Sequence, residues 1–365
     1  MEKKKSIDKL NELAIRDIDT LKHVKEEEID FIEYIAKGCS QEVPRLYDRV
    51  PPIIKYNRGN EELIRIVLDY YRTLDSEMYE QAKSIIMGQN DIPIAIYNRK
   101  DITRKRGQVE KELSGYDKFL QGSQIQWDEG YRMVYRNKER VIPIGKIYVQ
   151  RRENDYDIYS LAHEISHTFD RDKRDLSKTS VLLAEITPAC IEEMLSRYLE
   201  KKKIMTPDGI LRRRTERAKS IYIDSITTYT RMQLIKLYQK NGRLEKDDIK
   251  RIEQENNMSD NQMKWVLSYL LDEKSSIYYI SKYIIADLIS TPYFGKMYDE
   301  DSGKAIKMLK DFFKEMKYGS PESSLEALGI SSKKDIDGLI KQKAEYNREL
   351  HNANVKPKNK EREER

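Results

Sequence analysis

Two of the four histidines in this 365-residue chain flank a glutamate, in the segment His163-Glu164-Ile165-Ser166-His167. Residues four apart share one face of an α-helix, so both imidazoles could reach a single Zn²⁺ at about 2.0–2.1 Å. Glu164 would then stand beside the ion, placed to take a proton from a metal-bound water. The segment therefore predicts a zinc site that activates water.

The residues around this segment favour a helix that follows a strand. Apolar residues recur there at helical spacing, at Ile158, Leu161, Ala162 and Ile165. The stretch 146–150 is rich in β-branched and aromatic residues and predicts a strand, and turn-forming residues follow at 153–155. Zinc peptidases use a strand in this place because its edge can hydrogen-bond an extended substrate backbone.

A catalytic zinc site needs a third protein ligand. Glu185 lies 18 residues after His167, which is enough chain for a second helix to return beside the first. Glu192 follows seven residues later, two helical turns along the same face. We predict that Glu185 is the third ligand and that Glu192 orients one ligand histidine. Alternatively, this segment is an amphipathic helix whose glutamates simply face water.

Longer motifs surround these metal-site residues. They read Leu161-Ala162-His163-Glu164-x-x-His167 and Ala184-Glu185-x-x-x-x-x-x-Glu192-x-x-Leu195, and three further segments follow at 229–244, 277–286 and 318–330. In sequence and in order, these segments resemble the oligoendopeptidase F branch of the thimet-oligopeptidase-like zinc peptidases, which are of the gluzincin type. The resemblance covers roughly residues 140–350.

The chain departs from the family pattern in several places. Ser166 stands where the family usually has glycine, and residues 271–274 hold no histidine, although one normally precedes the tyrosine-rich helix. About 140 residues precede the matched region, whereas family members carry a much larger N-terminal half. These differences concern how a substrate would be enclosed rather than the type of reaction.

The resemblance implies a mainly α, zincin-like helical metallopeptidase with Zn²⁺ as its cofactor. It also implies that Tyr279 and Tyr283, four apart on one helical face, touch the substrate. A positioned phenol can donate a hydrogen bond to the developing oxyanion, and such donors typically change the rate by about 10²–10³. Against this, the chain has 25 tyrosines, and most of them must be ordinary residues at the edge of the core.

The function expected from these residues is zinc-dependent endopeptidase activity on oligopeptides or on an extended protein segment. Two alternatives stay open. One is an ImmA-like regulatory metallopeptidase that cleaves one specific protein partner, and the other is a non-catalytic binding protein with a vestigial metal site. Glu164 argues against the last alternative, because a structural zinc site has no need of a general base.

The composition of the chain bears on its partners and on its cellular compartment. The net charge is +5, from 68 basic and 63 acidic residues, which is too mixed to favour a nucleic-acid partner. The basic clusters 201–203 and 212–214 lack interleaved aromatic residues and are expected to be solvated helix faces. Cys39 and Cys190 are the only cysteines, as expected in a reducing cytoplasm. Neither a signal peptide nor a membrane span of about 18 apolar residues is predicted. Leaderless secretion and the oligomeric state stay open.

The chain is predicted to begin with an N-terminal helical region over residues 1–90. Apolar spacing predicts a helix over 6–37 that ends at Gly38, and a pair of helices over 60–88 divided near Asp75.

A metallopeptidase catalytic region over 91–350 is expected to follow. It would contain a sheet in 91–150, the metal-site helices in 156–200 and C-terminal helices in 215–350. A charged tail over 351–365 is expected to be disordered.

Strands at 91–97, 131–135 and 141–150 are expected to form a small three-stranded β-sheet beside the active-site helix. Residues 103–120 are expected to be helical. The predicted fold is therefore mainly α.

Overall fold

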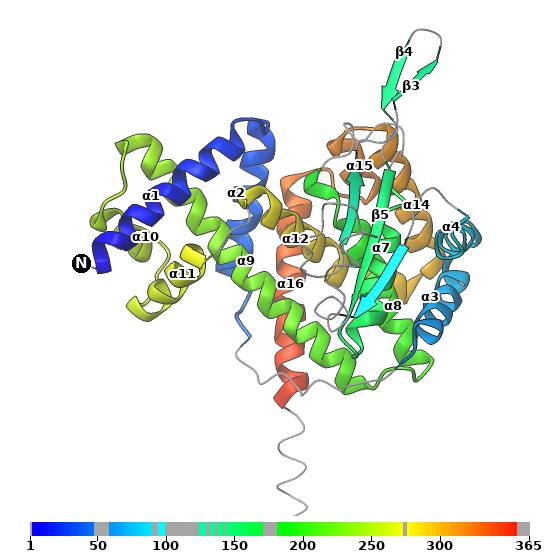
Figure 1. Ribbon diagram of the computed structural model, residues 1–365. Coiled ribbons are helices and arrows are strands. Elements are labelled where there is room, and N and C mark those ends of the chain that lie inside the picture. Colours follow the sequence, from blue (N-terminus) through cyan, green and yellow to red (C-terminus); the bar gives the residue numbers. More distant parts are fainter. Residues whose placement is uncertain are drawn as a thin grey trace, which may run out of the picture.

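The computed structural model describes most of the chain, namely residues 2–46, 58–89, 94–98, 124–128, 132–135, 138–141, 144–170, 181–272 and 276–355. The helix predicted at 103–120 and residues 356–365 of the predicted tail lie outside these stretches. Within them, helices dominate and strands are few (Figure 1). The prediction of a mainly α chain is confirmed for the described residues.

Four helices form the N-terminal part: α1 (Glu2–Leu21), α2 (Glu26–Glu42), α3 (Asn60–Leu74) and α4 (Ser76–Ile86). The division predicted near Asp75 is confirmed. The Asp75 carboxylate caps α4 by accepting hydrogen bonds from the backbone N–H groups of Glu77, at 2.9 Å, and Met78, at 3.2 Å. The single helix predicted over 6–37 is instead divided, because a turn separates α1 from α2.

The helix end predicted at Gly38 is wrong, since α2 continues through this residue to Glu42. A Cβ atom at Gly38 would meet Ile340 Cδ1 at 2.4 Å, and Ile340 belongs to the last helix, α16 (Lys333–Val355). The glycine therefore allows α2 and α16 to pack closely. The tail predicted from residue 351 also needs correction, because α16 is helical up to Val355.

The predicted three-stranded sheet is wrong in its composition. Strand β5 (Ile144–Arg151) pairs in parallel with β1 (Ile94–Asn98) and antiparallel with β2 (Gln124–Asp128), which was not predicted as a strand. The strand predicted at 131–135 forms β3 (Arg132–Tyr135), which pairs with β4 (Lys138–Val141) in a separate ribbon and not with the strand predicted at 141–150. Two residues connect β3 and β4, and such a short connection favours a tight hairpin over pairing with a more distant strand.

The remaining helical elements follow β5. They are α7 (Tyr156–Ser166), η3 (Val181–Leu183), α8 (Ile186–Lys201), α9 (Pro207–Asn241), α10 (Lys246–Glu255), α11 (Asp260–Asp272), α12 (Ile277–Leu288), the π-helix η4 (Ile289–Phe294), α13 (Gly295–Glu300), α14 (Ser302–Tyr318), α15 (Pro321–Ala327) and α16. The long helix α9 crosses the molecule and joins its two sides (Figure 1).

The hydrophobic core has a main part and a smaller part. The main part draws on α2, α3, β5, α7, α8, α12, α14 and α16, and the smaller part lies between α1, α9, α10 and α11. A buried ion pair strengthens the smaller part, because Arg231 Nε on α9 donates to Asp17 Oδ2 on α1 at 2.7 Å. Helix α9 thus contributes to both parts of the core.

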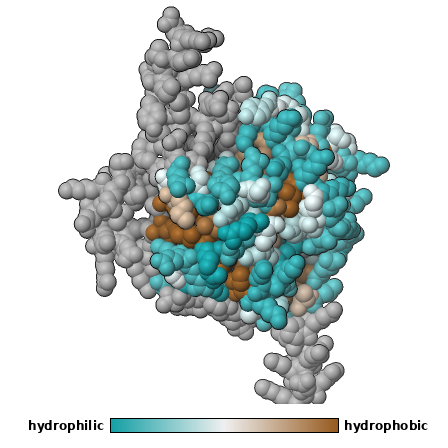
Figure 2. All heavy atoms as spheres, turned by 90° about the vertical axis from the view of Figure 1, so that its right-hand side faces the viewer, coloured by the Kyte–Doolittle hydropathy of each residue, from teal (hydrophilic) through white to brown (hydrophobic). Residues whose placement is uncertain are grey.

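The surface carries mostly polar side chains. Figure 2 shows one face that is largely hydrophilic, with a few separate apolar patches. This agrees with a chain in which 36% of the residues are charged. Among the described helices, none combines the length and the apolar character that crossing a bilayer requires.

Two adjacent tyrosines on α3 hold the helices of the candidate site. Tyr71 donates a hydrogen bond to the carbonyl of Ala162 on α7 at 2.7 Å, and Tyr70 donates to the carbonyl of Ile191 on α8 at 2.6 Å. Both tyrosines are fully buried. The two carbonyls precede His163 and Glu192 directly, so α3 fixes the backbone next to two predicted site residues.

The Tyr71 hydroxyl can be tested by Tyr71→Phe. We expect the free energy of unfolding to fall by about 1 kcal/mol, because a buried hydrogen bond is lost without loss of ring packing. Urea unfolding measures this change. Tyr318→Phe, at a tyrosine that is 71% exposed, is the matched control and should leave stability unchanged. Equal midpoints for Tyr71→Phe and the wild type would show that this bond contributes nothing.

Candidate metal centre

Helix α7 begins at a turn that Asp157 holds in place. The Asp157 carboxylate accepts hydrogen bonds from the backbone N–H groups of Arg152, at 2.6 Å, and Glu153, at 3.0 Å. Glu153 has a left-handed φ of 55°, which is uncommon for residues other than glycine, so these bonds support a strained turn. The apolar residues predicted to form a stripe are all at most 1% exposed: Ile158, Leu161, Ala162 and Ile165. This stripe fixes the rotation of α7.

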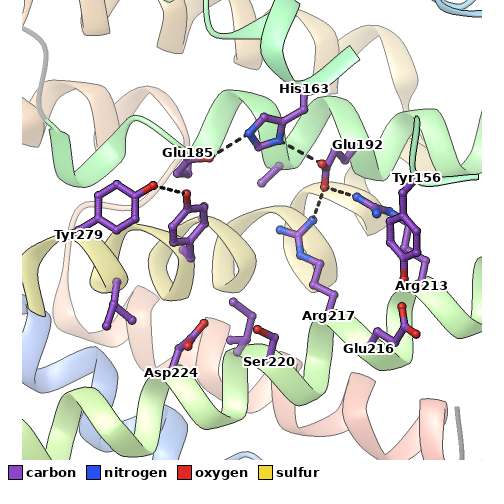
Figure 3. A pocket seen from close by; sticks show the side chains of 15 residues that line it. Tyr156, His163, Glu185, Glu192, Arg213, Glu216, Arg217, Ser220, Asp224 and Tyr279 are labelled. Carbon is purple, nitrogen blue, oxygen red and sulfur yellow. Dashed lines mark hydrogen bonds and ion pairs between the residues drawn. The ribbon is translucent and has the colours of Figure 1, made fainter. Parts of the chain in front are cut away.

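A cavity of about 540 Å³ lies between α7, α8, α9 and α12. His163 and Glu185 line one side, and Glu216, Ser220 and Asp224 line the other from successive turns of α9 (Figure 3). The volume falls within the range of about 300–1,000 Å³ that is usual for ligand sites. The predicted metal-site residues therefore border a space that a substrate could enter.

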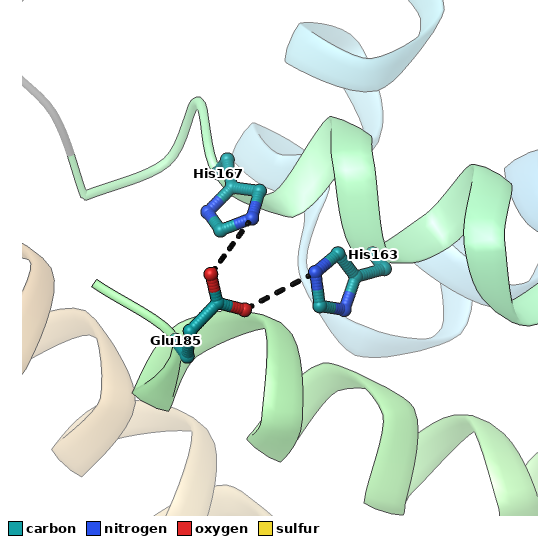
Figure 4. Close-up of side chains that lie close together, drawn as sticks. All are labelled: His163, His167 and Glu185. Atoms are coloured by element: carbon teal, nitrogen blue, oxygen red, sulfur yellow. Dashed lines mark ion pairs between the residues drawn. The ribbon is translucent and has the colours of Figure 1, made fainter. Parts of the chain in front are cut away.

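The structure brings His163, His167 and Glu185 together. The distance from His163 Nε2 to Glu185 Oε2 is 3.3 Å, and that from His167 Nε2 to Glu185 Oε1 is 3.8 Å (Figure 4). His167 directly follows α7 and keeps helical backbone angles, so both histidines stay on one face. Glu185 stands at the start of α8. One potential ligand atom from each residue lies within 4.8 Å of the other two.

These three residues fit a zinc ion. Glu185 Oε2 is buried, lies 3.3 Å from His163 Nε2 and has no hydrogen-bond partner among the described residues. Ligand atoms about 2.1 Å from a tetrahedral ion would lie about 3.4 Å apart, close to the 3.3 Å between His163 Nε2 and Glu185 Oε2. Imidazole nitrogen and carboxylate oxygen are donors that Zn²⁺ prefers. The cluster could therefore bind a metal ion.

Glu192 lies behind His163. Its Oε1 atom is 3.0 Å from His163 Nδ1, while Oε2 contacts Arg213 Nη2 at 2.7 Å and Arg217 Nη1 at 3.2 Å (Figure 3). Burial alone would raise the pKa of Glu192, but Arg213, His163 and Arg217 together hold it well below its usual range. A charged carboxylate only accepts hydrogen bonds, so Nδ1 donates and Nε2 is left to face Glu185. A residue that orients His163 is expected to make such a contact with Nδ1. The orienting role of Glu192 stays a prediction.

The interpretation of residues 212–214 as a solvated face is wrong. Arg212 is 1% exposed, Arg213 pairs with Glu192, and Arg214 Nη2 lies 3.3 Å from Glu193 Oε1. The absence of interleaved aromatic residues does not reveal these contacts, because their carboxylate partners lie on another helix. The spacing of Arg213 and Arg217, four apart on a long helix, was the available signal that two guanidinium groups share one face.

Glu164 and the two predicted tyrosines lie near the cluster. Glu164 is 4% exposed, and burial raises its pKa to about 7 although His163 opposes the shift. Tyr279 and Tyr283 both line the cavity, with their hydroxyl oxygens 3.1 Å apart. Burial, with Glu185 close by, raises the pKa of Tyr283, so its hydroxyl keeps its proton and remains a donor. His163, Glu185, Glu192, Tyr279 and Tyr283 therefore line one cavity, whereas Glu164 and His167 are buried and are not among its lining residues.

Lys282 is a site neighbour that the sequence analysis did not single out. Its Nζ atom donates a hydrogen bond to Glu185 Oε1 at 2.8 Å, and its side chain is buried. Lys282 directly precedes Tyr283 on α12. A lysine within a helical sequence pattern does not indicate a partner that lies 97 residues earlier, so the local sequence does not predict this contact.

Comparison with known proteins supports similarity at the level of the fold. No protein-family model matches the sequence, and no curated protein matches it. A solved structure from Chlamydophila abortus, of a protein named provisionally as a peptidase, matches with a TM-score of 0.52 and 15% sequence identity. The match covers 93% of this chain and 55% of that protein, so the chain spans about half of its length. The likeness to the oligoendopeptidase F branch stays a resemblance of motifs.

Glu185→Ala tests the third ligand. Changes to residues around metal ligands typically lower metal affinity by about 10–100-fold. We expect a larger loss of zinc affinity in Glu185→Ala, because a direct oxygen donor is lost. Zinc retained after dialysis, measured by atomic emission, reports this change. Glu200→Ala removes an exposed glutamate from the same helix and should retain zinc like the wild type. Unchanged occupancy in Glu185→Ala would reject Glu185 as a ligand.

Proposed function

We propose that this chain is a zinc-dependent endopeptidase that hydrolyses peptide bonds in oligopeptides or in an extended protein segment. The observation that carries the proposal is the convergence of His163, His167 and Glu185, of which His163 and Glu185 line a cavity, with Glu164 between the two histidines in the sequence. The fold shared with a protein named provisionally as a peptidase supports it. The two cysteines, Cys39 and Cys190, are buried and unpaired, which supports a reducing compartment such as the cytoplasm.

The zinc ion and the protein side chains would have different roles in the reaction. A zinc ion bound by the three residues would supply Lewis acidity toward a carbonyl and toward a water molecule. Glu164 would take the proton of the attacking water and later deliver it to the leaving amine. Because burial raises the pKa of Glu164 to about 7, this carboxyl is suited both to accept and to release a proton near neutral pH.

Donors for the oxyanion are available on α12. Attack on a peptide carbonyl places negative charge on oxygen, and preorganised hydrogen-bond donors stabilise that charge. Tyr283 is the better placed of the two predicted tyrosines, because it is more buried and interacts electrostatically with both Glu185 and Glu164. Tyr279 is 46% exposed, and its hydroxyl lies against that of Tyr283. We infer that Tyr283 donates to the oxyanion and that Tyr279 orients it.

Glu164→Gln separates metal binding from catalysis. We expect the variant to retain zinc and to cleave about 10²–10⁴-fold more slowly, because the general base is lost while the ligands remain. Mass spectrometry of a peptide library incubated with each protein measures cleavage, and Glu200→Gln is the control.

Three other outcomes of the library experiment have distinct meanings. Cleavage by Glu164→Gln at the wild-type rate would show that Glu164 is not the base. If the wild type cleaved no library peptide but cut one protein, the regulatory peptidase predicted as an alternative would replace the present proposal. Zinc binding without any hydrolysis would favour the non-catalytic alternative.

Tyr283→Phe tests the oxyanion donor. We expect kcat to fall by about 10²–10³ with little change in KM, because the lost hydrogen bond forms only as charge develops on the carbonyl oxygen. Steady-state kinetics on a peptide found in the library measures both constants. Tyr278→Phe changes a tyrosine five residues earlier in the same helix that does not line the cavity, and it should keep the wild-type kcat. A fall in kcat for Tyr278→Phe but not for Tyr283→Phe would contradict the assignment.

A further inference from the structure

A buried lysine shares a carboxylate with the candidate metal site. Lys282 Nζ donates to Glu185 Oε1 at 2.8 Å, whereas Glu185 Oε2 faces His163 Nε2 at 3.3 Å. The two oxygens of one carboxyl group therefore have different neighbours. One is held by an ammonium group, and the other points to the place where the ion would bind.

The surroundings of Lys282 strengthen this contact. Its Nζ atom lies 4.0 Å from the centroid of the Tyr279 ring and 4.9 Å from that of the Tyr283 ring, so two aromatic rings flank the ammonium group. Lys282 is 8% exposed, and removing an ammonium group from water is unfavourable unless a negative partner compensates. Glu185, which is 4% exposed, has the same requirement with the opposite sign.

We propose that Lys282 is a built-in counter-charge for the third metal ligand. It binds Oε1, leaves Oε2 directed toward the histidines, and balances the buried carboxylate when no metal is bound. This inference rests on the proposed function, because it assigns Lys282 a role only in relation to a metal bound by His163, His167 and Glu185.

The proposal makes a specific claim about the metal-free protein. Without Lys282, the buried Glu185 carboxylate loses one of the cations that compensate it, and a bound metal then supplies the missing positive charge. The loss of Lys282 should therefore destabilise the metal-free protein more than the zinc-bound protein. A ligand that binds only the folded state raises the melting temperature, so the zinc-induced rise reports this difference.

The experiment compares Lys282→Met with the wild type, each as the full chain after removal of metal by a chelator. Melting temperatures are measured without metal and with excess ZnCl₂. We expect the zinc-induced rise to be larger in Lys282→Met than in the wild type, by about 2 °C or more. The Kd for zinc, from competition with a chromogenic chelator, should fall, because a positive charge beside the ion has been removed.

Arg231→Met is the matched control. Arg231 is also buried and pairs with a buried carboxylate, since its Nε donates to Asp17 Oδ2 at 2.7 Å, but neither residue belongs to the candidate metal cluster. This variant should lower both melting temperatures equally and keep the wild-type zinc-induced rise. Lys282→Arg retains the positive charge and should also keep the wild-type rise. Lys282→Gln provides the same comparison if Lys282→Met does not fold in either condition.

The outcomes distinguish this inference from the function on which it rests. A Lys282→Met protein that folds only when zinc is present would support the counter-charge role. A zinc-induced rise in Lys282→Met that equals or falls below that of the wild type would overturn it and leave the zinc site intact. A wild type whose melting temperature and chelator competition show no zinc binding would instead reject the metal site and the proposed function.

Discussion

The candidate site depends on the burial of one negative charge. The Glu185 carboxylate is 4% exposed, and a carboxylate removed from water must be compensated by cations or hydrogen-bond donors. Burial alone would raise the pKa of Glu185, yet His167, His163 and Lys282 hold it well below its usual range. These partners come from α7 and α12, while Glu185 itself begins α8. The three helices therefore cannot separate without leaving a buried charge unpaired.

A second set of buried charges extends outward from His163. Glu192 on α8 binds Arg217 on α9, Arg217 Nε lies 2.7 Å from Asp287 Oδ1 on α12, and Asp287 binds Lys343 on α16. Positive and negative groups alternate along this path, so each is compensated on both sides. Removing one member of a buried pair typically costs about 3–5 kcal/mol, because the other is left alone. The orientation of His163 is thus tied to α9 and α16, which supply none of the three candidate metal ligands.

The sequence was sufficient where chemistry follows from local spacing. His163 and His167 lie four apart, and no helical conformation of this segment could put them on different faces. Glu185 required one further assumption, that the chain returns as a second helix, and the structure shows such a return. The Asp75 cap was predictable for the same reason, since its partners are two and three residues away.

Contacts between distant segments were not predictable in this way. Lys282 and Glu185 are 97 residues apart, and the charge of a lysine does not indicate which carboxylate it will meet. Strand β2 depends on pairing with β5, which its own short sequence does not specify. The helix end predicted at Gly38 rests on a glycine that follows the apolar repeat, whereas the role of Gly38 is set by the approach of Ile340 from the last helix. In each case the missing information was the tertiary neighbour.

Helix α12 carries both the lysine that pairs with Glu185 and the two tyrosines that are proposed to act on the oxyanion. Ser276 caps its first turn by accepting a hydrogen bond from the backbone N–H of Tyr279 at 3.1 Å, and the π-helix η4 follows its last turn directly. Tyr279, Lys282 and Tyr283 lie within the first two turns. Because the Lys282 ammonium group contacts both tyrosine rings, the residue that compensates the ligand carboxylate also fixes the two phenols. Any shift of α12 would therefore displace the counter-charge and the proposed oxyanion donors together, and the position of this short helix determines both.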